Sequence, residues 1–201
     1  ICLLKFLKIK HTNNDVFEIA LEGEKIFHGN PSGGDLAAVL QNGIVLFRKG
    51  KTKIKVKSLN FKIPESINKL LLINSGKPIE TTAEMVELVE QKYQESPLEI
   101  TKIFQSQGAL ATRLVKILKK GEQEKFIKAV KKAELNLEKL GVVGSVAQQM
   151  IRDIEKLGGG AKISGAGGGG FFTFYVPEDH LNFRRAMRES GLREMSWLEP
   201  W

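Results

Sequence analysis

A run of glycines near the C-terminal end constrains this chain more than any other feature. Eight of the 20 glycines lie between Gly158 and Gly170, and the last four are consecutive. Glycine permits positive φ and has no Cβ, so successive backbone N–H groups can converge on an anion. Residues 171–176 have the apolar, aromatic character of a strand. The segment is predicted to be a phosphate-holding loop between two strands. A tight turn is the simpler alternative, although it needs only one or two glycines.

Composition places the chain among ordinary folded proteins. Its 201 residues allow one large domain or two small ones, and 42% hydrophobic with 27% charged residues exclude a disordered chain. No apolar run approaches the roughly 18 residues of a transmembrane helix. The single cysteine, Cys2, cannot form an internal disulfide. We therefore expect a cytoplasmic protein with no membrane partner.

The net charge of +8 raises the question of nucleic-acid binding. In the densest lysine stripe, residues 48–57, lysines alternate with Thr52, Ile54 and Val56, the period of a strand with one solvated and one buried face. A second lysine group, in residues 116–132, has helical spacing and is typical of a solvated face. Neither group carries a row of aromatic side chains that would stack on bases. We predict a surface that attracts anionic ligands but binds no nucleic acid.

Hydrophobic periodicity predicts an α+β architecture. Helices are expected at residues 15–27, after Asp35, at 79–93 with Thr81 or Thr82 as the cap, three times within 97–157, and after Pro177. Strands are expected in a hairpin through Gly50, at 69–75, on both sides of the glycine loop, and at 192–198. Ser145 is expected to cap the third of the three central helices.

A second motif, residues 28–35, combines turn formers with two candidate catalytic groups. Asp35 lies at a loop-to-helix junction, where it could cap its own helix or accept a proton from a hydroxyl group. Glu24 lies one turn before His28, near a helix end where the dipole disfavours a carboxylate. A nearby cation such as Mg²⁺ would offset that cost. The residues alone leave these alternatives open.

Other catalytic classes are excluded by residue placement. His28 and His180 are isolated, so the spacing of a zinc site is missing. Cys2 has no histidine partner nearby, and Ser164 does not lie in a nucleophile elbow.

Three segments resemble those of the GHMP kinase superfamily and, within it, the mevalonate kinases. Residues 22–35 (EGEKIFHGNPSGGD) resemble the segment written HGxPSG, followed by a hydrophobic residue and Asp. Residues 69–86 resemble the family's strand, turn and capped helix. LEKLGVVGS and residues 158–172 resemble its C-terminal helix and third motif. The three follow one another in the family's order.

This resemblance implies a GHMP kinase-like fold of two parts. Residues 1–62 are expected to be the remnant of a ribosomal-protein-S5-like N-terminal domain that carries the catalytic aspartate loop. Residues 63–201 are expected to form a ferredoxin-like α+β C-terminal domain.

The resemblance also implies roles for individual residues. Asp35 matches the catalytic aspartate, and Glu24 matches a glutamate that helps to hold Mg²⁺. The substrate side would be lined by His28, Gly29, Asn30, Pro31, Ser32 and Thr82. The phosphates of the nucleotide would lie beside Ser164, Gly165, Ala166, Gly167, Gly168 and Gly169. Gly34 departs from the usual Ile or Val and is expected to leave more room, and Phe171 departs from a smaller residue.

The implied activity is the ATP-dependent phosphorylation of the primary hydroxyl of mevalonate, giving 5-phosphomevalonate in isoprenoid biosynthesis. ATP is the co-substrate, Mg²⁺ the metal, and mevalonate or a similar small hydroxylated anionic metabolite the partner; a homodimer is left open. The family's N-terminal lysine motif and its P-x-x-x-G-L-x-S-S motif are missing, and the chain begins at Ile1. We therefore expect the C-terminal two-thirds of such an enzyme, inactive by itself.

Two alternatives stay open. The chain could belong to another GHMP kinase that acts on phosphomevalonate, homoserine or a sugar; the decarboxylase that shares the fold is disfavoured by HGNPSG. It could also be a non-catalytic binding module that has lost its ATP half.

Overall fold

The computed structural model describes residues 1–28, 31–50, 53–67, 70–74, 80–167, 171–175, 180–189 and 194–198. They belong to two compact units, Ile1–Phe61 and Lys62–Trp201. That the first unit is the remnant of a particular domain stays a prediction.

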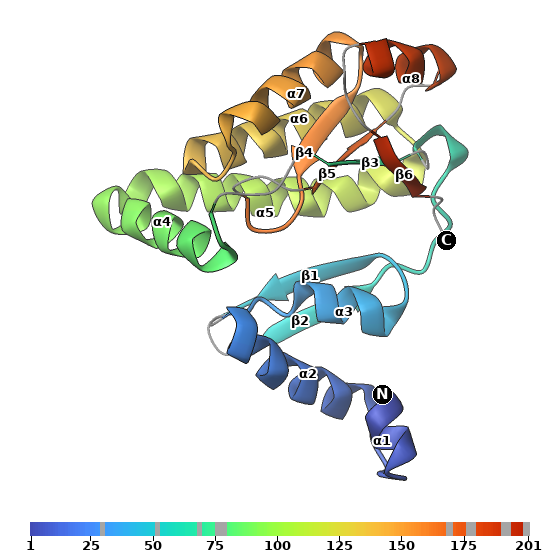
Figure 1. The fold of residues 1–201 in the computed structure, drawn as a ribbon, viewed down its shortest axis with the longest axis vertical. Helices are drawn as coiled ribbons and strands as arrows, with labels where there is room; N and C mark the ends of the chain where they lie inside the picture. Colours follow the sequence, from blue (N-terminus) through green and yellow to red (C-terminus); the bar gives the residue numbers. More distant parts are fainter. Residues whose placement is uncertain are drawn as a thin grey trace. The chain divides into compact units, whose positions relative to one another are not determined.

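The first unit consists of three helices and a hairpin (Figure 1). The helices are α1 (Cys2–Phe6), α2 (Asn13–His28) and α3 (Gly34–Gln41), and the strands are β1 (Val45–Lys49) and β2 (Ile54–Ser58). The strands are antiparallel, with Val45 opposite Ser58 and Lys49 opposite Ile54. Gly50 N donates to Lys53 O at 2.9 Å. The predicted hairpin and the helix that stops at His28 are confirmed, whereas the hydrophobic periodicity did not reveal α1.

The predicted buried face of β2 is only partly present. Ile54 is half-buried, but Val56 keeps 38% of its surface exposed. Both side chains line a hollow of about 340 Å³ that also borders Phe17 of α2 and Leu40 of α3. Val56 therefore stays partly exposed beside this hollow, although its place in the alternation predicts burial.

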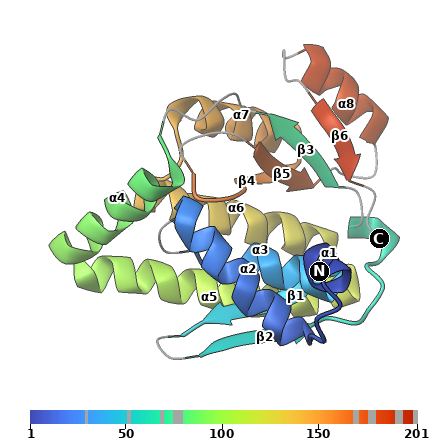
Figure 2. The same cartoon turned by 60° about the horizontal axis from the view of Figure 1, so that its bottom comes forward.

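The second unit combines a four-stranded sheet with helices (Figures 1 and 2). Its elements are the 3-10 turn η1 (Glu65–Ile67), β3 (Leu70–Asn74), α4 (Thr82–Glu95), α5 (Pro97–Lys120), α6 (Gln123–Leu140), α7 (Ser145–Lys156), β4 (Gly160–Ile163), β5 (Phe171–Tyr175), α8 (His180–Glu189) and β6 (Glu194–Leu198). The strand order is β4-β5-β3-β6, and every neighbouring pair is antiparallel. The α+β prediction is confirmed.

Local signals explain where the helices of this unit begin and end. Thr81 caps α4 in a capping box with Glu84. Gly121 and Gly141, with φ of 68° and 79°, end α5 and α6 in the left-handed conformation. The prediction for Ser145 is wrong: Gly144 is the N-cap of α7, and Ser145 is its first helical residue.

The core of the second unit joins the helices to the sheet. One cluster of buried residues brings together Ile73 of β3, Ile151 and Ile154 of α7, and Ala161 and Ile163 of β4. A second cluster packs α5 and α6 on η1. Helix α6 packs against both α5 and β4, so it connects the sheet edge to the outer helix.

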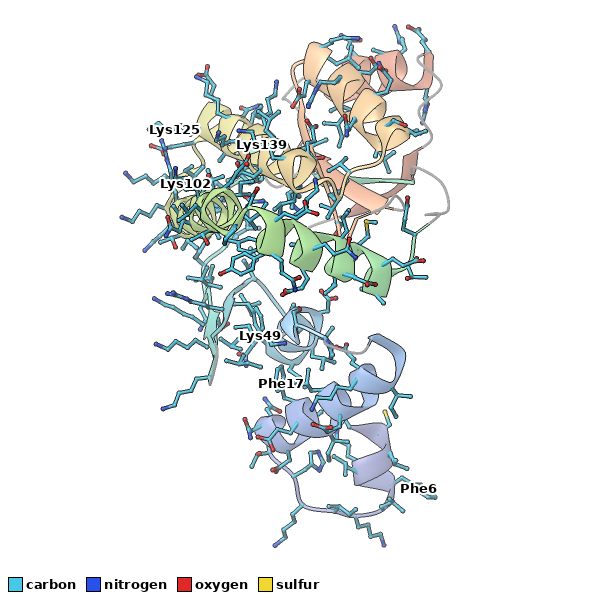
Figure 3. All side chains as sticks on the ribbon, turned by 90° about the vertical axis from the view of Figure 1, so that its left-hand side faces the viewer. Phe6, Phe17, Lys49, Lys102, Lys125 and Lys139 are labelled. Atoms are coloured by element: carbon cyan, nitrogen blue, oxygen red, sulfur yellow. The ribbon has the colours of Figure 1, made fainter. Side chains whose placement is uncertain are left out.

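The outer faces of α5 and α6 carry lysines, as the helical spacing predicts. Lys102, Lys125 and Lys139 extend away from their helices (Figure 3), and all three are exposed. Among the helices in the described part of the chain, none has the length and apolar character that crossing a membrane requires.

Candidate functional site

Asp35 lies in the first turn of α3 with its side chain exposed. It does not cap the helix, because Gly33 is the N-cap and no side chain bonds to the cap. The dipole of the helix favours a carboxylate in its first turn. The Asp35 carboxylate is therefore exposed to solvent and makes no capping hydrogen bond.

The loop that leads into Asp35 is fixed by local contacts. Gly33 is buried with a φ of +80°, and a Cβ there would lie 2.9 Å from Phe17 Cζ of α2. Gly34 N donates to Ser32 Oγ at 3.1 Å, and the Nζ of Lys49 on β1 donates to the carbonyl of Pro31 at 2.8 Å. The described part of the loop is therefore held from α2 and β1.

Side chains of neighbouring residues lie close to Gly34, the residue before Asp35, where the family usually has Ile or Val. A Cβ at Gly34 would lie 3.3 Å from Ser32 Oγ and 3.7 Å from Phe47 Cδ1. A side chain at this position would therefore contact Ser32 and Phe47 from its first carbon onward.

Glu24 and His28 lie on α2, one turn apart, and the Glu24 side chain is half-buried. Gly29 and Asn30 fall outside the described residues, as does the side chain of His28. Within the described ranges, no group of three His, Cys, Asp or Glu side chains could hold a metal ion. A carboxylate such as Glu24 has the hard oxygen atoms that Mg²⁺ prefers, and its metal role stays a prediction.

The glycine loop of the second unit leaves the end of β4 and returns as β5, as predicted. Ser164 and Gly165 are exposed, and Gly165 has a φ of +84°. Gly167 has a φ of +110°, and a Cβ there would lie only 2.2 Å from the carbonyl oxygen of Val142. Glycine is therefore required at Gly167 both by conformation and by space. Gly168 and Gly169 lie outside the described residues.

Val142 belongs to the turn between α6 and α7, so the loop packs against this turn at Gly167. The N-terminus of α7 follows two residues later, and its N-cap Gly144 supplies no side-chain hydrogen bond. Backbone N–H groups at such a helix start favour anions. The loop thus lies against the turn that leads into α7, and its role in binding phosphate stays a prediction.

Thr82 is the first residue of α4, and it is exposed. The sequence left open whether Thr81 or Thr82 caps this helix. Thr81 does so: its Oγ1 accepts from Glu84 N at 3.2 Å, while Glu84 Oε2 accepts from Thr81 N at 2.6 Å. The Thr82 hydroxyl is therefore not used for capping.

Two charged residues next to the glycine loop were missed from the sequence. Glu134 of α6 is fully buried, and its Oε2 accepts from Ile163 N at 2.9 Å. Lys162 Nζ donates to Ile163 O at 2.6 Å. Burial raises the pKa of Glu134 to about 7 and lowers the pKa of Lys162. One signal was present: Glu134 follows the buried Phe126 and Val130 by eight and four residues, on the same helix face.

The predicted site residues thus fall into two groups. Glu24, Pro31, Ser32 and Asp35 lie in the first unit, on α2, on α3 and in the loop between them. Thr82 and residues 164–167 lie in the second unit, at the starts of α4 and of the loop after β4. Each group belongs to one unit, and the assignment of its members to one site stays a prediction.

The sequence is similar to curated mevalonate kinases. The relative from Aeropyrum pernix is 27% identical over 157 residues, which cover 78% of this chain and 47% of that protein. The mouse mevalonate kinase is 31% identical over 160 residues, covering 75% of this chain and 38% of that protein. The chain thus spans about half the length or less of these relatives. No family model matches the chain.

The fold is similar to solved GHMP kinases. The mevalonate kinase of L. major in complex with R-mevalonate superposes with a TM-score of 0.80 and 20% identity, over 96% of this chain and 60% of that one. The phosphomevalonate kinase of Streptococcus pneumoniae in complex with phosphomevalonate and AMPPNP gives 0.79 and 18%, over 98% and 64%. At these identities the likeness establishes the fold. Together with the sequence matches, it confirms the resemblance to the mevalonate kinases within the GHMP superfamily.

Proposed function

We propose that this chain, a relative of the mevalonate kinases with the GHMP kinase fold, carries the catalytic base and a phosphate loop of an ATP-dependent kinase for the primary hydroxyl of mevalonate. One observation supports this most strongly. The loop after β4 is closed against Val142 at Gly167, where no side chain fits. Gly165 and Gly167 also have positive φ, a conformation that allows successive backbone N–H groups to converge on an anion. The other supports are the exposed Asp35 and the similarity to mevalonate kinases.

In this proposal Asp35 accepts the proton of the substrate hydroxyl as its oxygen attacks the γ-phosphorus of ATP. The bond from that phosphorus to the β,γ-bridging oxygen breaks, and ADP leaves. Phosphoryl transfer depends mostly on positioning and on stabilising the charge of the equatorial oxygens. The N–H groups of residues 164–169 donate to these oxygens. Pro31, Ser32 and the rest of the 28–32 segment line the substrate, with Thr82 as a further hydroxyl.

Glu24 is the residue that would hold Mg²⁺. Its half-buried carboxylate has the right donor chemistry, and one or two carboxylates together with substrate phosphates are the usual protein ligands of this ion. When bound, Mg²⁺ neutralises phosphate charge. Asp35, whose carboxylate is not used for capping, is left to take the proton.

The domain assignment belongs to the same proposal. The second unit has the strand order β4-β5-β3-β6, with four helices between β3 and β4 and one between β5 and β6. This order supports a ferredoxin-like domain. The first unit, with the Asp35 loop and one hairpin, is proposed to be part of the ribosomal-protein-S5-like domain.

The isolated chain is proposed to be inactive. The P-x-x-x-G-L-x-S-S segment and the lysine of the family are not among its 201 residues. Both act on the triphosphate in the family, so the loop after β4 would hold the nucleotide incompletely. ADP release from the 201-residue chain, with ATP, Mg²⁺ and mevalonate, is expected to stay at background. Turnover by this chain would contradict the proposal.

The test of the base uses the gene product that contains these 201 residues. In Asp35→Asn the proton acceptor is lost but the shape is kept, so kcat is expected to fall at least about 100-fold. The matched control is Asp153→Asn on α7, whose carboxylate binds Gln149 and Lys156 at the surface. Its kcat should stay within about twofold of the wild type. A wild-type kcat in Asp35→Asn would refute the assignment.

A second candidate is another GHMP kinase, favoured by the fold similarity to a phosphomevalonate kinase. A panel of mevalonate, phosphomevalonate, homoserine and galactose, assayed by ADP release, separates these activities. The non-catalytic alternative predicts no heat of binding with ATP, Mg²⁺ or mevalonate in calorimetry, whereas a kinase binds at least the nucleotide.

A further inference from the structure

The glycine loop leaves the sheet from an edge strand. In the order β4-β5-β3-β6, β4 is terminal, and its last residue, Ile163, lies opposite Phe172 of β5. The outer side of an edge strand carries N–H and C=O groups that no further strand can satisfy. Ile163 is buried, so its outward backbone groups need partners from elsewhere in the fold.

Charged side chains supply both partners. The N–H of Ile163 donates to Glu134 Oε2 at 2.9 Å, and its carbonyl accepts from Lys162 Nζ at 2.6 Å. Glu134 comes from the middle of α6, so the residue directly before Ser164 is bound to that helix. A buried hydrogen bond to a charged group is worth more than a neutral one, which makes this an effective anchor.

The far end of the described loop meets the turn that follows the same helix. Gly167 lies against the carbonyl of Val142, two residues past the end of α6. Residues 164–166 are therefore held between two contacts, one at Glu134 and one at Val142. The position of this loop therefore depends on α6 at one point and on the turn after α6 at the other.

Glu134 is an unusual anchor because its charge is poorly compensated. Its Oε1 is buried and has no hydrogen-bond partner among the described residues. Three charged groups face it: Lys162 on β4, Glu138 on α6 and Arg152 on α7. Arg152 already pairs with Glu138 and Glu155, which leaves Lys162 as the main counter-ion. Burial brings the pKa of Glu134 to about 7, so its charge changes near neutral pH.

We propose that Glu134 is a positioning residue for the loop 164–167, held through its hydrogen bond to Ile163 N, and that its negative charge weakens phosphate binding there. The proposal rests on the proposed function, since the phosphate is that of ATP. An ionised carboxylate bonded to Ile163 repels phosphate oxygens and neutralises Lys162, whereas the protonated form does neither. The loop therefore binds anions more tightly below pH 7 than above it.

The first experiment needs no ligand. The amide resonances of Ile163, Ser164 and Gly165 in the 201-residue chain are followed by NMR from pH 5 to pH 9. They are expected to shift with a midpoint near pH 7 in the wild type and not in Glu134→Gln. Glutamine keeps the size of the side chain and an acceptor for the Ile163 N–H, so the variant is expected to fold. The same midpoint in Glu134→Gln would overturn the assignment.

Two neighbouring variants separate an electrostatic role from a structural one. Lys162→Met removes the cation and should move the midpoint to higher pH, because the ionised form loses its counter-ion. Glu138→Gln removes a like charge and should move it to lower pH. A merely structural change would not shift the midpoint in opposite directions. Movement in the same direction, or none, would overturn the pairing of Glu134 with Lys162.

The second experiment measures ATP affinity by calorimetry on the gene product that contains this chain. The ratio of the wild-type Kd to the Glu134→Gln Kd cancels the ionisation of ATP itself. This ratio is expected to rise at least about threefold between pH 6 and pH 8. A constant ratio would overturn the coupling between Glu134 and the loop while leaving the kinase proposal intact. If neither protein binds ATP but the amides titrate as described, the kinase proposal fails and Glu134 remains the anchor of the loop.

Discussion

At the scale of single residues, two glycines of the loop show how a backbone position can depend on different physical causes. Gly165 and Gly167 both have positive φ, at +84° and +110°. Nothing lies within 4 Å of a Cβ built on Gly165, whereas one on Gly167 would overlap the Val142 carbonyl. Gly165 needs glycine for conformation alone, and Gly167 needs it for conformation and space.

This difference predicts unequal costs of adding one methyl group. Gly167→Ala is expected to lower the free energy of unfolding by about 3 kcal/mol, because the strained φ and the clash with Val142 add together. Gly165→Ala, the matched control, is expected to cost about 1 kcal/mol from the backbone alone. Urea denaturation of the 201-residue chain measures both. Equal losses in the two variants would show that the loop does not close against Val142.

Residue identity alone could not reveal the burial of Glu134. Glutamate in an amphipathic helix is usually solvated, and α6 is rich in lysine and glutamate. Glu134 is buried because the edge of β4, far along the chain, needs an acceptor on that side. The unpaired N–H of Ile163 exists only once the sheet has formed. The hydrophobic pattern of α6 can therefore show that Glu134 lies on the buried face, but not that it bonds to Ile163.

At the scale of elements, the helices and strands could largely be predicted from the sequence, but their periodicity did not reveal α1 and the N-cap predicted for α7 is wrong. The glycines at the ends of α5 and α6 predict their termini because the left-handed conformation there favours glycine strongly. At the starts of α3 and α7, Asp35 and Ser145 are good capping residues, yet Gly33 and Gly144 occupy the N-cap. The backbone conformation of the residues that lead into each helix determines which residue is the N-cap. The identity of a nearby capping side chain does not reveal that conformation.

The start of α4 gives a test of capping at this scale. Thr81→Ala removes the hydroxyl of the capping box and is expected to lower the free energy of unfolding by about 1 kcal/mol. Thr82→Ala, one residue along and exposed, makes no capping bond and should change it by less than about 0.5 kcal/mol. Thermal or urea unfolding followed by circular dichroism distinguishes the two. A larger loss in Thr82→Ala would reverse the assignment of the cap.

At the scale of the whole molecule, the two units differ in how much core each contains. Within the described part of the first unit, the buried apolar side chains are Val16 and Ala37. Phe6, Ile26 and Val39 remain 81%, 82% and 77% exposed. The second unit contains two clusters of buried residues from helices and strands. The first unit therefore buries little apolar surface within its described residues.

The two units should therefore differ when they are produced separately. Residues 62–201 are expected to unfold in one cooperative transition, because they contain a core of their own. Residues 1–61 are expected to show no cooperative transition, since so few apolar side chains are buried. Circular dichroism during heating of each fragment makes the comparison. Cooperative unfolding of residues 1–61 would show that this unit is self-sufficient.

The last turns of helix α6 also set the spacing between two residues that contact the glycine loop, Glu134 and Val142. Glu134 lies seven residues before Gly141, the residue that ends the helix, and each residue turns a helix by about 100° and advances it by about 1.5 Å. One residue inserted between them would turn Glu134 away from β4 while the Val142 turn stayed in place. The length of this stretch is therefore as tightly constrained as the residues at its ends. Insertions or deletions are expected to accumulate elsewhere in the chain.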